Sequence, residues 1–413
     1  MAPFPFVQPS WRAALRAGKG SKAQKAETPD DGPAVLPLGA RQAAVRSAPG
    51  QERAEVRGYR KFRRKRKAQD GSCSARLLDR TDVAVPERND DHQPGESMSV
   101  AFVFPGQGSQ SVGMGKGLAD AFRCARGVFE EIDAALGDKL SAVMWEGPAD
   151  KVMLTENAQP ALVAVSLAAM RVLQTEAGVD LKRDASFVAG HSVGEYSALA
   201  AAGSLSFADA VRLVRLRGRA MQEAVPVGVG AMAALLGVEF EQAAAIAAEA
   251  AQGEVVQAAN DNGAGQVVVS GHKAAVERAI EIARAKGVRR TAMLPVSAPF
   301  HSALMKPAAA VMADALARVT VRPPAVPLVT NVLARATSDP GEIVQGLVEQ
   351  VTGTVRWRES VGFMARAGVS SFYEVGPGKV LSALIQRIAK GASSFAIGAP
   401  DDIAAFKSKS MSH

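Results

Sequence analysis

The 413-residue sequence has few cysteines, few aromatic residues and no long uncharged apolar run. Its two cysteines, Cys73 and Cys124, are too few for a disulfide framework or a cysteine-rich zinc site, and they are typical of a reducing compartment. No uncharged apolar run reaches the roughly 18 residues that a membrane-spanning helix needs. The N-terminus lacks the charged-then-apolar order of a secretory signal. Disulfide-rich secreted proteins and membrane proteins are therefore excluded, and a cytoplasmic protein is expected.

The sequence also lacks an even distribution of charge. The net charge is +8 at pH 7, but residues 1–97 contain 19 Lys and Arg against 12 Asp and Glu, whereas the remaining residues contain 30 against 29. The basic character therefore belongs to the N-terminal leader. The high isoelectric point does not indicate a nucleic-acid partner for the rest of the chain.

The leader, residues 1–97, is rich in Pro, Gly, Arg and Ala and shows no sustained apolar period, so we predict that it is disordered. Its basic block at 60–67 is interpreted as part of a solvated tail, with a nucleic-acid or localisation patch as the alternative. A transit peptide, which would place the protein in an organelle matrix, is another alternative, because residues 1–26 carry five Lys or Arg. We hypothesise that Met98 is the true start.

Apolar patterning divides the rest of the chain into a large unit and an insert. Residues 98–225 and 297–400 are predicted to form an α/β-hydrolase-like catalytic subdomain, in which the strands of a parallel sheet alternate with helices. Between them, residues 226–296 show the order strand–helix–strand twice, which is the ferredoxin-like pattern. Residues 401–413 are expected to be a frayed tail. Residues 226–296 are interpreted as an insert because candidate catalytic motifs lie on both sides of them.

The strongest of these motifs is GHSVG at residues 190–194. It follows a predicted buried strand at 185–189 and precedes an alanine-rich helix at 195–202, which is the setting of a nucleophile elbow. The glycines let the backbone turn sharply, and this turn lifts the hydroxyl of Ser192 out of the sheet. The start of the helix directs the N–H of Val193 toward a reacting group. An ordinary turn is the alternative, but the strand–turn–helix setting favours a nucleophile.

A serine nucleophile needs a base. The five histidines of the sequence are His92, His191, His272, His301 and His413. The first lies in the leader, the last is terminal, and His272 follows a glycine in the insert. The side chain of His191 is expected to point away from the adjacent serine. By elimination, His301 is the candidate base, and a structural histidine is the alternative.

Five motifs extend this interpretation. They are FPGQGSQ at 104–110, GHSVGEYS at 190–197, RG at 217–218, APFH at 298–301 and EVGPG at 374–378. In order and spacing they resemble the malonyl-CoA:acyl carrier protein transacylases of fatty acid synthesis, over residues 99–388. The resemblance implies that Ser192 carries the malonyl group as an ester and that His301 is its base. It also implies that Gln107 and the Val193 N–H form the oxyanion hole.

The resemblance further places the malonyl carboxylate on Arg217. A guanidinium offers the paired N–H groups that a carboxylate needs. Four arginines, at 212, 215, 217 and 219, lie on one predicted helix and cannot all share a face, so a solvated arginine is the alternative for each of them.

The remaining implied site residues are less distinctive. No aspartate follows in the Ser…Asp…His order of a hydrolase triad, and the family instead orients the base with a backbone carbonyl near the position of Gln350. Gln159 and Asn260 match pocket positions, with ordinary turn and strand-end roles as the alternatives. Val193 and Phe300 are similar to the residues of malonyl-selecting members.

The implied substrates are malonyl-CoA and acyl carrier protein, and we expect a monomer with no metal, no bound cofactor, no membrane and no nucleic acid as partner. Because carrier proteins are typically acidic, a basic rim is expected around the pocket. Lys286, Arg289 and Arg290 are candidates for it, and a solvated helix end explains them equally well.

Three other functions remain open. A serine hydrolase or thioesterase is compatible with the elbow, although Arg217 and the insert favour a transferase. An acyltransferase of a polyketide pathway fits the same motifs. A non-enzymatic scaffold with a nucleic-acid-binding leader requires the serine, histidine and glutamine motifs to be coincidental.

Overall fold

A computed structural model describes residues 99–410 of the chain. The predictions of a disordered leader, of its basic block and of a start at Met98 lie outside the described residues. None of the described helices is both long and apolar enough to cross a membrane.

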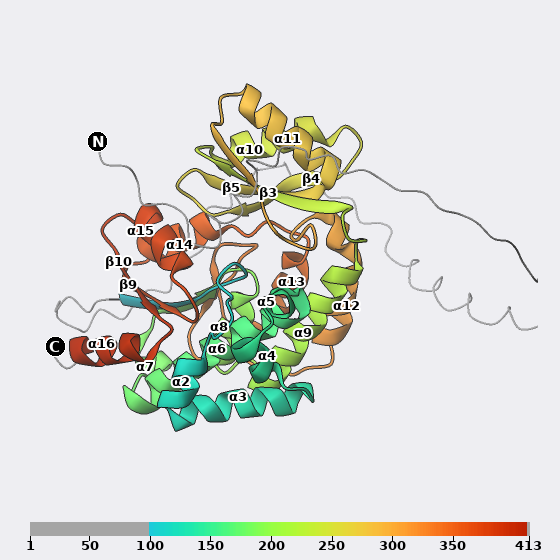
Figure 1. Ribbon diagram of the computed structural model, residues 1–413. Helices are drawn as coiled ribbons and strands as arrows, with labels where there is room; N and C mark the ends of the chain where they lie inside the picture. Colours follow the sequence, from blue (N-terminus) through green and yellow to red (C-terminus); the bar gives the residue numbers. More distant parts are fainter. Residues whose placement is uncertain (1–98, 411–413) are drawn as a thin grey trace, which may run out of the picture. The chain divides into compact units, whose positions relative to one another are not determined.

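The larger of two sheets has six strands in the order β10-β9-β1-β2-β7-β8 (Figure 1). These strands are β1 (Ser99–Phe104), β2 (Phe187–Gly190), β7 (Leu328–Val329), β8 (Ala336–Thr337), β9 (Val369–Val375) and β10 (Ser393–Ile397). All neighbours are parallel except β7 and β8. Phe104 pairs with Gly190, so β1 and β2 end side by side. The loops that follow them therefore meet at the carboxyl edge of the sheet, where open α/β sheets bind ligands.

Helices pack on both faces of this sheet. They are α2 (Lys116–Ala121), α3 (Arg123–Leu136), α4 (Leu140–Glu146), α5 (Ala149–Met153), α6 (Thr155–Glu176), α7 (Leu181–Asp184), α8 (Gly194–Ala201), α9 (Phe207–Glu223), the 3₁₀ turn η1 (Ala303–Met305), α12 (Lys306–Leu316), α13 (Pro340–Gln350), α14 (Trp357–Arg366), α15 (Val380–Ile388) and α16 (Pro400–Ser410). Along β1, Phe102 and Phe104 belong to the apolar core that includes α6 and α9. Ala101 and Val103 belong to the opposite core, with Trp357 of α14. This alternation follows from the two-residue period of a strand that is buried on both faces.

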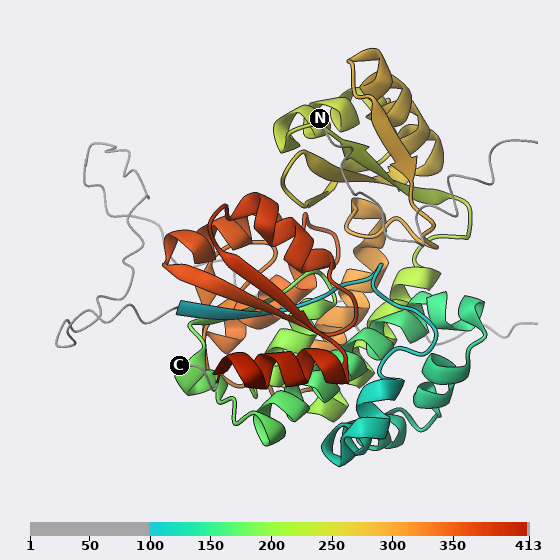
Figure 2. The same cartoon turned by 60° about the vertical axis from the view of Figure 1, so that its left-hand side comes forward.

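The second sheet is antiparallel, in the order β4-β5-β3-β6. Its elements are β3 (Gly230–Leu236), α10 (Phe240–Ala251), β4 (Val256–Asp261), β5 (Gln266–His272), α11 (Lys273–Ala285) and β6 (Arg290–Met293). Both helices cover the outer face of this sheet, and the other face is turned to the large subdomain (Figures 1 and 2). The strand order is that of a ferredoxin-like unit. The predicted fold class, a parallel α/β unit with a ferredoxin-like insert, is confirmed, while the exact domain boundaries stay a prediction.

One local expectation was wrong. The tail after residue 400 was expected to be frayed, but it forms α16, in which Ile403 is buried and Phe406 packs against the core. Figure 2 shows this helix running beside the strands β9 and β10. These tertiary contacts stabilise the helix α16, and they cannot be recognised from the local sequence.

Helices α6 and α9 approach each other closely at Gly218. A Cβ atom there would lie 2.7 Å from the Cα atom of Glu156 and 2.7 Å from the carbonyl oxygen of Thr155. Gly218→Ala must therefore separate the two helices, and we expect it to lower the free energy of unfolding by about 1–3 kcal/mol. Chemical denaturation measures the change.

The matched control is Gly127→Ala, because Gly127 also lies in a helix but nothing stands within 4 Å of its Cβ position. This variant should be more stable than the wild type by about 0.5–1 kcal/mol. If Gly218→Ala raised the free energy of unfolding to the same extent, the inference that the two helices pack closely at Gly218 would be wrong.

Candidate active site

The GHSVG motif forms a sharp turn between β2 and α8. Ser192 has a left-handed backbone with a φ of +52°, which is uncommon for a residue with a side chain. Both flanking glycines are required: a Cβ atom on Gly190 would lie 1.9 Å from the carbonyl carbon of Gly194, and one on Gly194 would lie 2.2 Å from the Phe104 carbonyl oxygen. The turn therefore presents the serine side chain as a nucleophile elbow does.

His301 lies beside this serine. The Ser192 Oγ and His301 Nε2 atoms are 2.7 Å apart, and both residues are buried. The His301 Nδ1 atom lies 2.8 Å from the backbone oxygen of Gln350. Because a carbonyl oxygen can only accept a hydrogen bond, Nδ1 carries the proton and Nε2 accepts the proton of the serine hydroxyl. Burial, followed by the charge of Arg217, lowers the pKa of His301 to about 3. The imidazole is therefore neutral at pH 7, as a general base must be.

Arg217 on α9 is the third member of the cluster, with only 1% of its surface exposed. Its Nη1 donates to Gln159 Oε1 at 2.7 Å, and its Nη2 donates to Gln350 Oε1 at 2.8 Å and to Ser192 Oγ at 3.3 Å. Burial lowers the pKa of Arg217, but an arginine stays charged at neutral pH. A positive charge thus lies next to the serine hydroxyl, and a guanidinium can bind the carboxylate of an acyl group through paired N–H groups.

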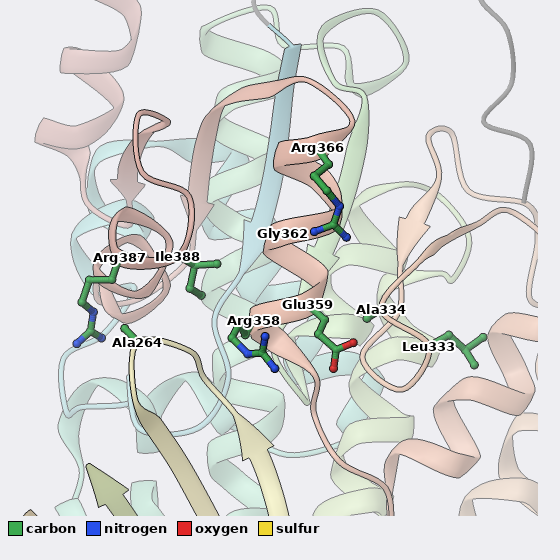
Figure 3. Close-up of a pocket in the computed structure, with 9 residues that line it drawn as sticks. All are labelled: Ala264, Leu333, Ala334, Arg358, Glu359, Gly362, Arg366, Arg387 and Ile388. Carbon is green, nitrogen blue, oxygen red and sulfur yellow. The ribbon is translucent and has the colours of Figure 1, made fainter. Parts of the chain in front are cut away.

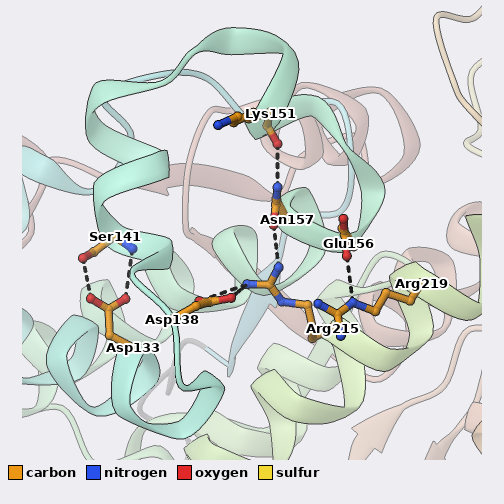
Figure 4. Close-up of polar contacts among 8 residues, drawn as sticks. All are labelled: Asp133, Asp138, Ser141, Lys151, Glu156, Asn157, Arg215 and Arg219. Atoms are coloured by element: carbon orange, nitrogen blue, oxygen red, sulfur yellow. Dashed lines mark hydrogen bonds and ion pairs between the residues drawn. The ribbon is translucent and has the colours of Figure 1, made fainter.

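Neighbouring arginines hold α9 in place (Figure 4). Arg215 donates to Asn157 at 2.5 Å and pairs with Asp138 at 2.9 Å, and Arg219 pairs with Glu156 at 2.7 Å. These contacts join α9 to the start of α6 and to the connection between α3 and α4. They fix the helix on both sides of the buried arginine between them.

The two predicted oxyanion donors lie at the ends of β1 and β2. The loop after β1 touches the elbow, because a Cβ atom on Gly106 would be 2.5 Å from the carbonyl oxygen of His191. The side chain of Gln107 donates to Thr155 Oγ1 at 2.7 Å, which leaves its second amide hydrogen for another acceptor. Within residues 99–410 we find no hydrogen bond between Gln107 and Ser192, and none donated by the Val193 N–H.

The other predicted residues divide into two groups. Gln159 joins the cluster through its contact with the guanidinium, as described above. Asn260 in β4 is buried and its backbone bridges to Val355, but in the described part of the chain its side chain forms no hydrogen bond with the cluster. Of the predicted basic rim, Lys286 pairs with Glu249 at 2.8 Å.

Two residues that the sequence analysis missed complete the site. Asn331, just after β7, accepts the N–H of Ser192 at 2.7 Å through Oδ1 and donates to the Gly190 carbonyl at 2.6 Å through Nδ2. Glu195 on α8 is buried and accepts a hydrogen bond from Gln350 Nε2 at 2.5 Å. Asn331 lies at the edge of the sheet that carries the ligand sites of such folds, but an asparagine after a strand is ordinary in the sequence. Glu195 resembled an ordinary acidic residue in the first turn of a helix.

A cavity of about 510 Å³ lies outside this cluster, between α14, α15 and the β4–β5 turn (Figure 3). Three arginines line it, Arg358, Arg366 and Arg387, together with Glu359 and small or apolar residues. Arg358 is paired with Asp261 at 2.8 Å. In residues 99–410 no group of three His, Cys, Asp or Glu side chains is placed to hold a metal ion.

Comparisons with known proteins agree on one family. Residues 101–400 match the family model described as the acyl transferase domain. The malonyl CoA-acyl carrier protein transacylase of Escherichia coli K12 is 48% identical over 305 residues, which are 74% of this chain and 97% of that protein. The protein of the same name from Bacillus subtilis 168 is 44% identical, over 74% of this chain and 95% of its own length.

Solved structures agree with these relatives. The acyl-carrier-protein S-malonyltransferase of Bartonella henselae superposes with a TM-score of 0.73 at 52% identity, covering 75% of this chain and 98% of its own. A malonyl-transacylase solved in complex with a type II polyketide acyl-carrier protein superposes with a TM-score of 0.73 at 42% identity, covering 75% and 99%.

The hydrogen bonds of Asn331 predict a role in holding the elbow. Asn331→Ala removes the partners of the Ser192 N–H and of the Gly190 carbonyl. If Ser192 is the nucleophile, we expect its acylation by malonyl-CoA and by acetyl-CoA to slow equally, about tenfold or more, because the change displaces the serine itself. Rapid-quench intact mass spectrometry measures both rates. The control is Asn157→Ala, which loses two hydrogen bonds away from the serine. A loss confined to one acyl group would contradict the prediction.

Proposed function

The chain belongs to the family of malonyl CoA-acyl carrier protein transacylases, and we propose that Ser192 and His301 carry out the reaction of that family here. This reaction transfers a malonyl group from malonyl-CoA to the phosphopantetheine thiol of acyl carrier protein, in fatty acid synthesis. One observation carries the assignment of the residues. The Ser192 Oγ atom lies 2.7 Å from a neutral imidazole and 3.3 Å from a buried guanidinium.

The first half of the proposed mechanism forms the malonyl-enzyme. His301 Nε2 takes the hydroxyl proton while Ser192 Oγ attacks the thioester carbonyl of malonyl-CoA. The resulting oxyanion is stabilised by the Val193 N–H and the Gln107 amide. When the tetrahedral intermediate collapses, the carbon–sulfur bond breaks and the imidazolium returns its proton to the departing thiolate of coenzyme A. The malonyl group is then an ester of Ser192.

The second half repeats these steps with a different nucleophile. His301 removes the proton of the phosphopantetheine thiol, and the sulfur attacks the ester carbonyl. The carbon–oxygen bond to Ser192 breaks, and the imidazolium protonates the departing serine oxygen. In both halves the Gln350 backbone oxygen keeps the imidazole in one tautomer, with Nδ1 protonated.

Arg217 supports the malonyl group as substrate over a neutral acyl group. In the proposed complex the malonyl carboxylate binds both terminal nitrogens of the guanidinium, which is the bidentate geometry that arginine favours, while Gln159 and Gln350 keep the guanidinium in position. A buried guanidinium beside the nucleophile gives a neutral acyl group no comparable contact. This residue therefore favours the transacylase over a general serine hydrolase. The alternative acceptor is a polyketide carrier protein. The malonyl-transacylase solved in complex with a type II polyketide acyl-carrier protein is a reason to test it.

The proposed enzyme needs only its two substrates. The cluster around Ser192 is built from one chain, so we propose that the monomer is active. We also propose that the enzyme acts in the cytoplasm and that no cofactor is bound. The acidic carrier protein would approach a basic surface, and the predicted rim residues Arg289 and Arg290 on the small subdomain stay candidates for it.

Intact mass spectrometry tests the proposed nucleophile. Wild-type protein mixed with malonyl-CoA should gain one malonyl group, and acyl carrier protein should then remove it. Ser192→Ala should gain none, because no other hydroxyl lies in hydrogen-bond contact with His301 Nε2 within residues 99–410. Ser302→Ala is a matched control, since Ser302 is buried next to the histidine but donates to the Pro299 carbonyl. Free malonate released without carrier protein would instead indicate a hydrolase.

A second prediction concerns Arg217. Arg217→Ala should lower kcat/KM for malonyl-CoA about a hundredfold or more, because it removes a buried charge-assisted contact, while acetyl-CoA should lose much less. Arg219→Ala is the matched control on the same helix, because Arg219 is 55% exposed and pairs with Glu156. Steady-state kinetics with both thioesters measure the effect. An equal loss for both thioesters would make Arg217 structural.

A further inference from the structure

Glu195 is a buried carboxyl group that the mechanism above does not use. It lies on α8, three residues after the nucleophile, with 1% of its surface exposed. Its Oε2 atom accepts a hydrogen bond from Gln350 Nε2 at 2.5 Å. A carboxyl group is costly to bury, so its place within this cluster calls for a function.

The chemistry of the neighbours fixes the direction of every hydrogen bond around Gln350. A guanidinium has only donors, so the amide atom that faces Arg217 must be the oxygen Oε1. The nitrogen Nε2 then faces Glu195 and also donates to the Ser192 carbonyl at 3.0 Å. An ionised carboxylate has only acceptors, so it holds the amide in this one orientation.

If the amide turned over, its Nε2 would face the guanidinium. Two donors would then oppose each other, and Arg217 would lose one of its two amide acceptors beside Ser192. The backbone oxygen of Gln350, which orients His301, lies at the end of α13 and does not depend on the side-chain amide. Glu195 therefore acts mainly on the arginine, and through it on the acyl carboxylate.

We propose that Glu195 is a positioning residue for substrate choice: its carboxylate locks the Gln350 amide, and this amide holds Arg217 in the geometry that receives the malonyl carboxylate. The proposal rests on the function proposed above. It assigns part of the selectivity to a residue that touches neither the substrate nor the reacting atoms.

Protonation of Glu195 should weaken this lock. Burial raises the pKa of Glu195 to about 7, against the lowering effects of the Gln350 and Asn331 hydrogen bonds and of the Arg217 charge. The other charged or titratable groups around it are Tyr196, whose pKa burial raises, and His301, which is neutral at these pH values. A raised pKa means that the carboxylate is ionised above about pH 7 and takes up a proton below it. A protonated carboxyl can donate as well as accept, so it no longer dictates the orientation of the amide.

The first test is Glu195→Gln. An amide replaces one of the two carboxylate oxygens by a donor nitrogen, so the side chain no longer has acceptors only and no longer fixes the Gln350 amide in one orientation. We expect kcat/KM for malonyl-CoA to fall about tenfold while that for acetyl-CoA changes less than about threefold. Glu195→Asp keeps the charge and should recover part of the malonyl activity.

The matched control is Glu374→Gln. Glu374 is also a fully buried glutamate, but its carboxylate accepts the backbone N–H groups of Leu381 and Ser382 at the start of α15. This variant should melt at a lower temperature than the wild type and keep the malonyl-to-acetyl ratio unchanged. An unchanged ratio in Glu195→Gln, at full or reduced activity, would overturn the proposal.

The second test needs no variant and does not depend on how well a variant folds. In the wild type, the ratio of malonyl to acetyl loading should fall as the pH is lowered from 8 to 6, and the acetyl rate in the same samples serves as the internal reference. A ratio that is constant over this range would also overturn the proposal. Failure of the wild type to form any malonyl ester would instead overturn the proposed function, so the two failures are distinguishable.

Discussion

A guanidinium buried beside a serine hydroxyl is the constraint on which the site depends. Arg217 is almost without solvent contact, so its N–H groups must find acceptors inside the protein. Gln159 and Gln350 supply them to the two terminal nitrogens from α6 and α13, whereas Nε has no hydrogen-bond partner among the described residues. The ring of Tyr196 lies 5.9 Å from the guanidinium carbon. These acceptors are amide oxygens rather than carboxylates. The arginine therefore keeps a net positive charge that a substrate carboxylate can neutralise, which joins acyl selection to the position of the nucleophile.

The insert matters because of where it enters and leaves the large subdomain. It begins just after α9, which carries the arginine, and ends just before His301. Its strand β4 contacts the catalytic unit at several points: Asn260 bridges to Val355, and Asp261 pairs with Arg358 at 2.8 Å. Just after the strand, Asn262 lies 2.8 Å from His191, the neighbour of Ser192. The small sheet thus packs against the segment that carries Ser192.

Much of this arrangement could be predicted from the sequence, and the remainder shows where local patterns fail. The elbow was predictable because its strand, glycines and helix are consecutive in the sequence. The ferredoxin-like unit was predictable because strand-like and helix-like apolar periods alternate within one segment. His301 was reached by elimination and resemblance, since its partner Gln350 is distant in the chain. Asn331 and Glu195 could not be predicted from local patterns alone, because an asparagine after a strand or a glutamate in a first turn is ordinary until tertiary structure buries it.

The claim that connects fold to function is that the acyl carboxylate lies on Arg217 while the acyl carbonyl is bonded to Ser192. A crystal structure of the malonyl-enzyme, trapped from malonyl-CoA in the absence of carrier protein, tests it most directly. We predict an ester on Ser192 Oγ, a carboxylate paired with both terminal nitrogens of Arg217, and a Gln350 amide still bound to Glu195. An ester on another residue, or a malonyl carboxylate that points to solvent and not to Arg217, would contradict this account.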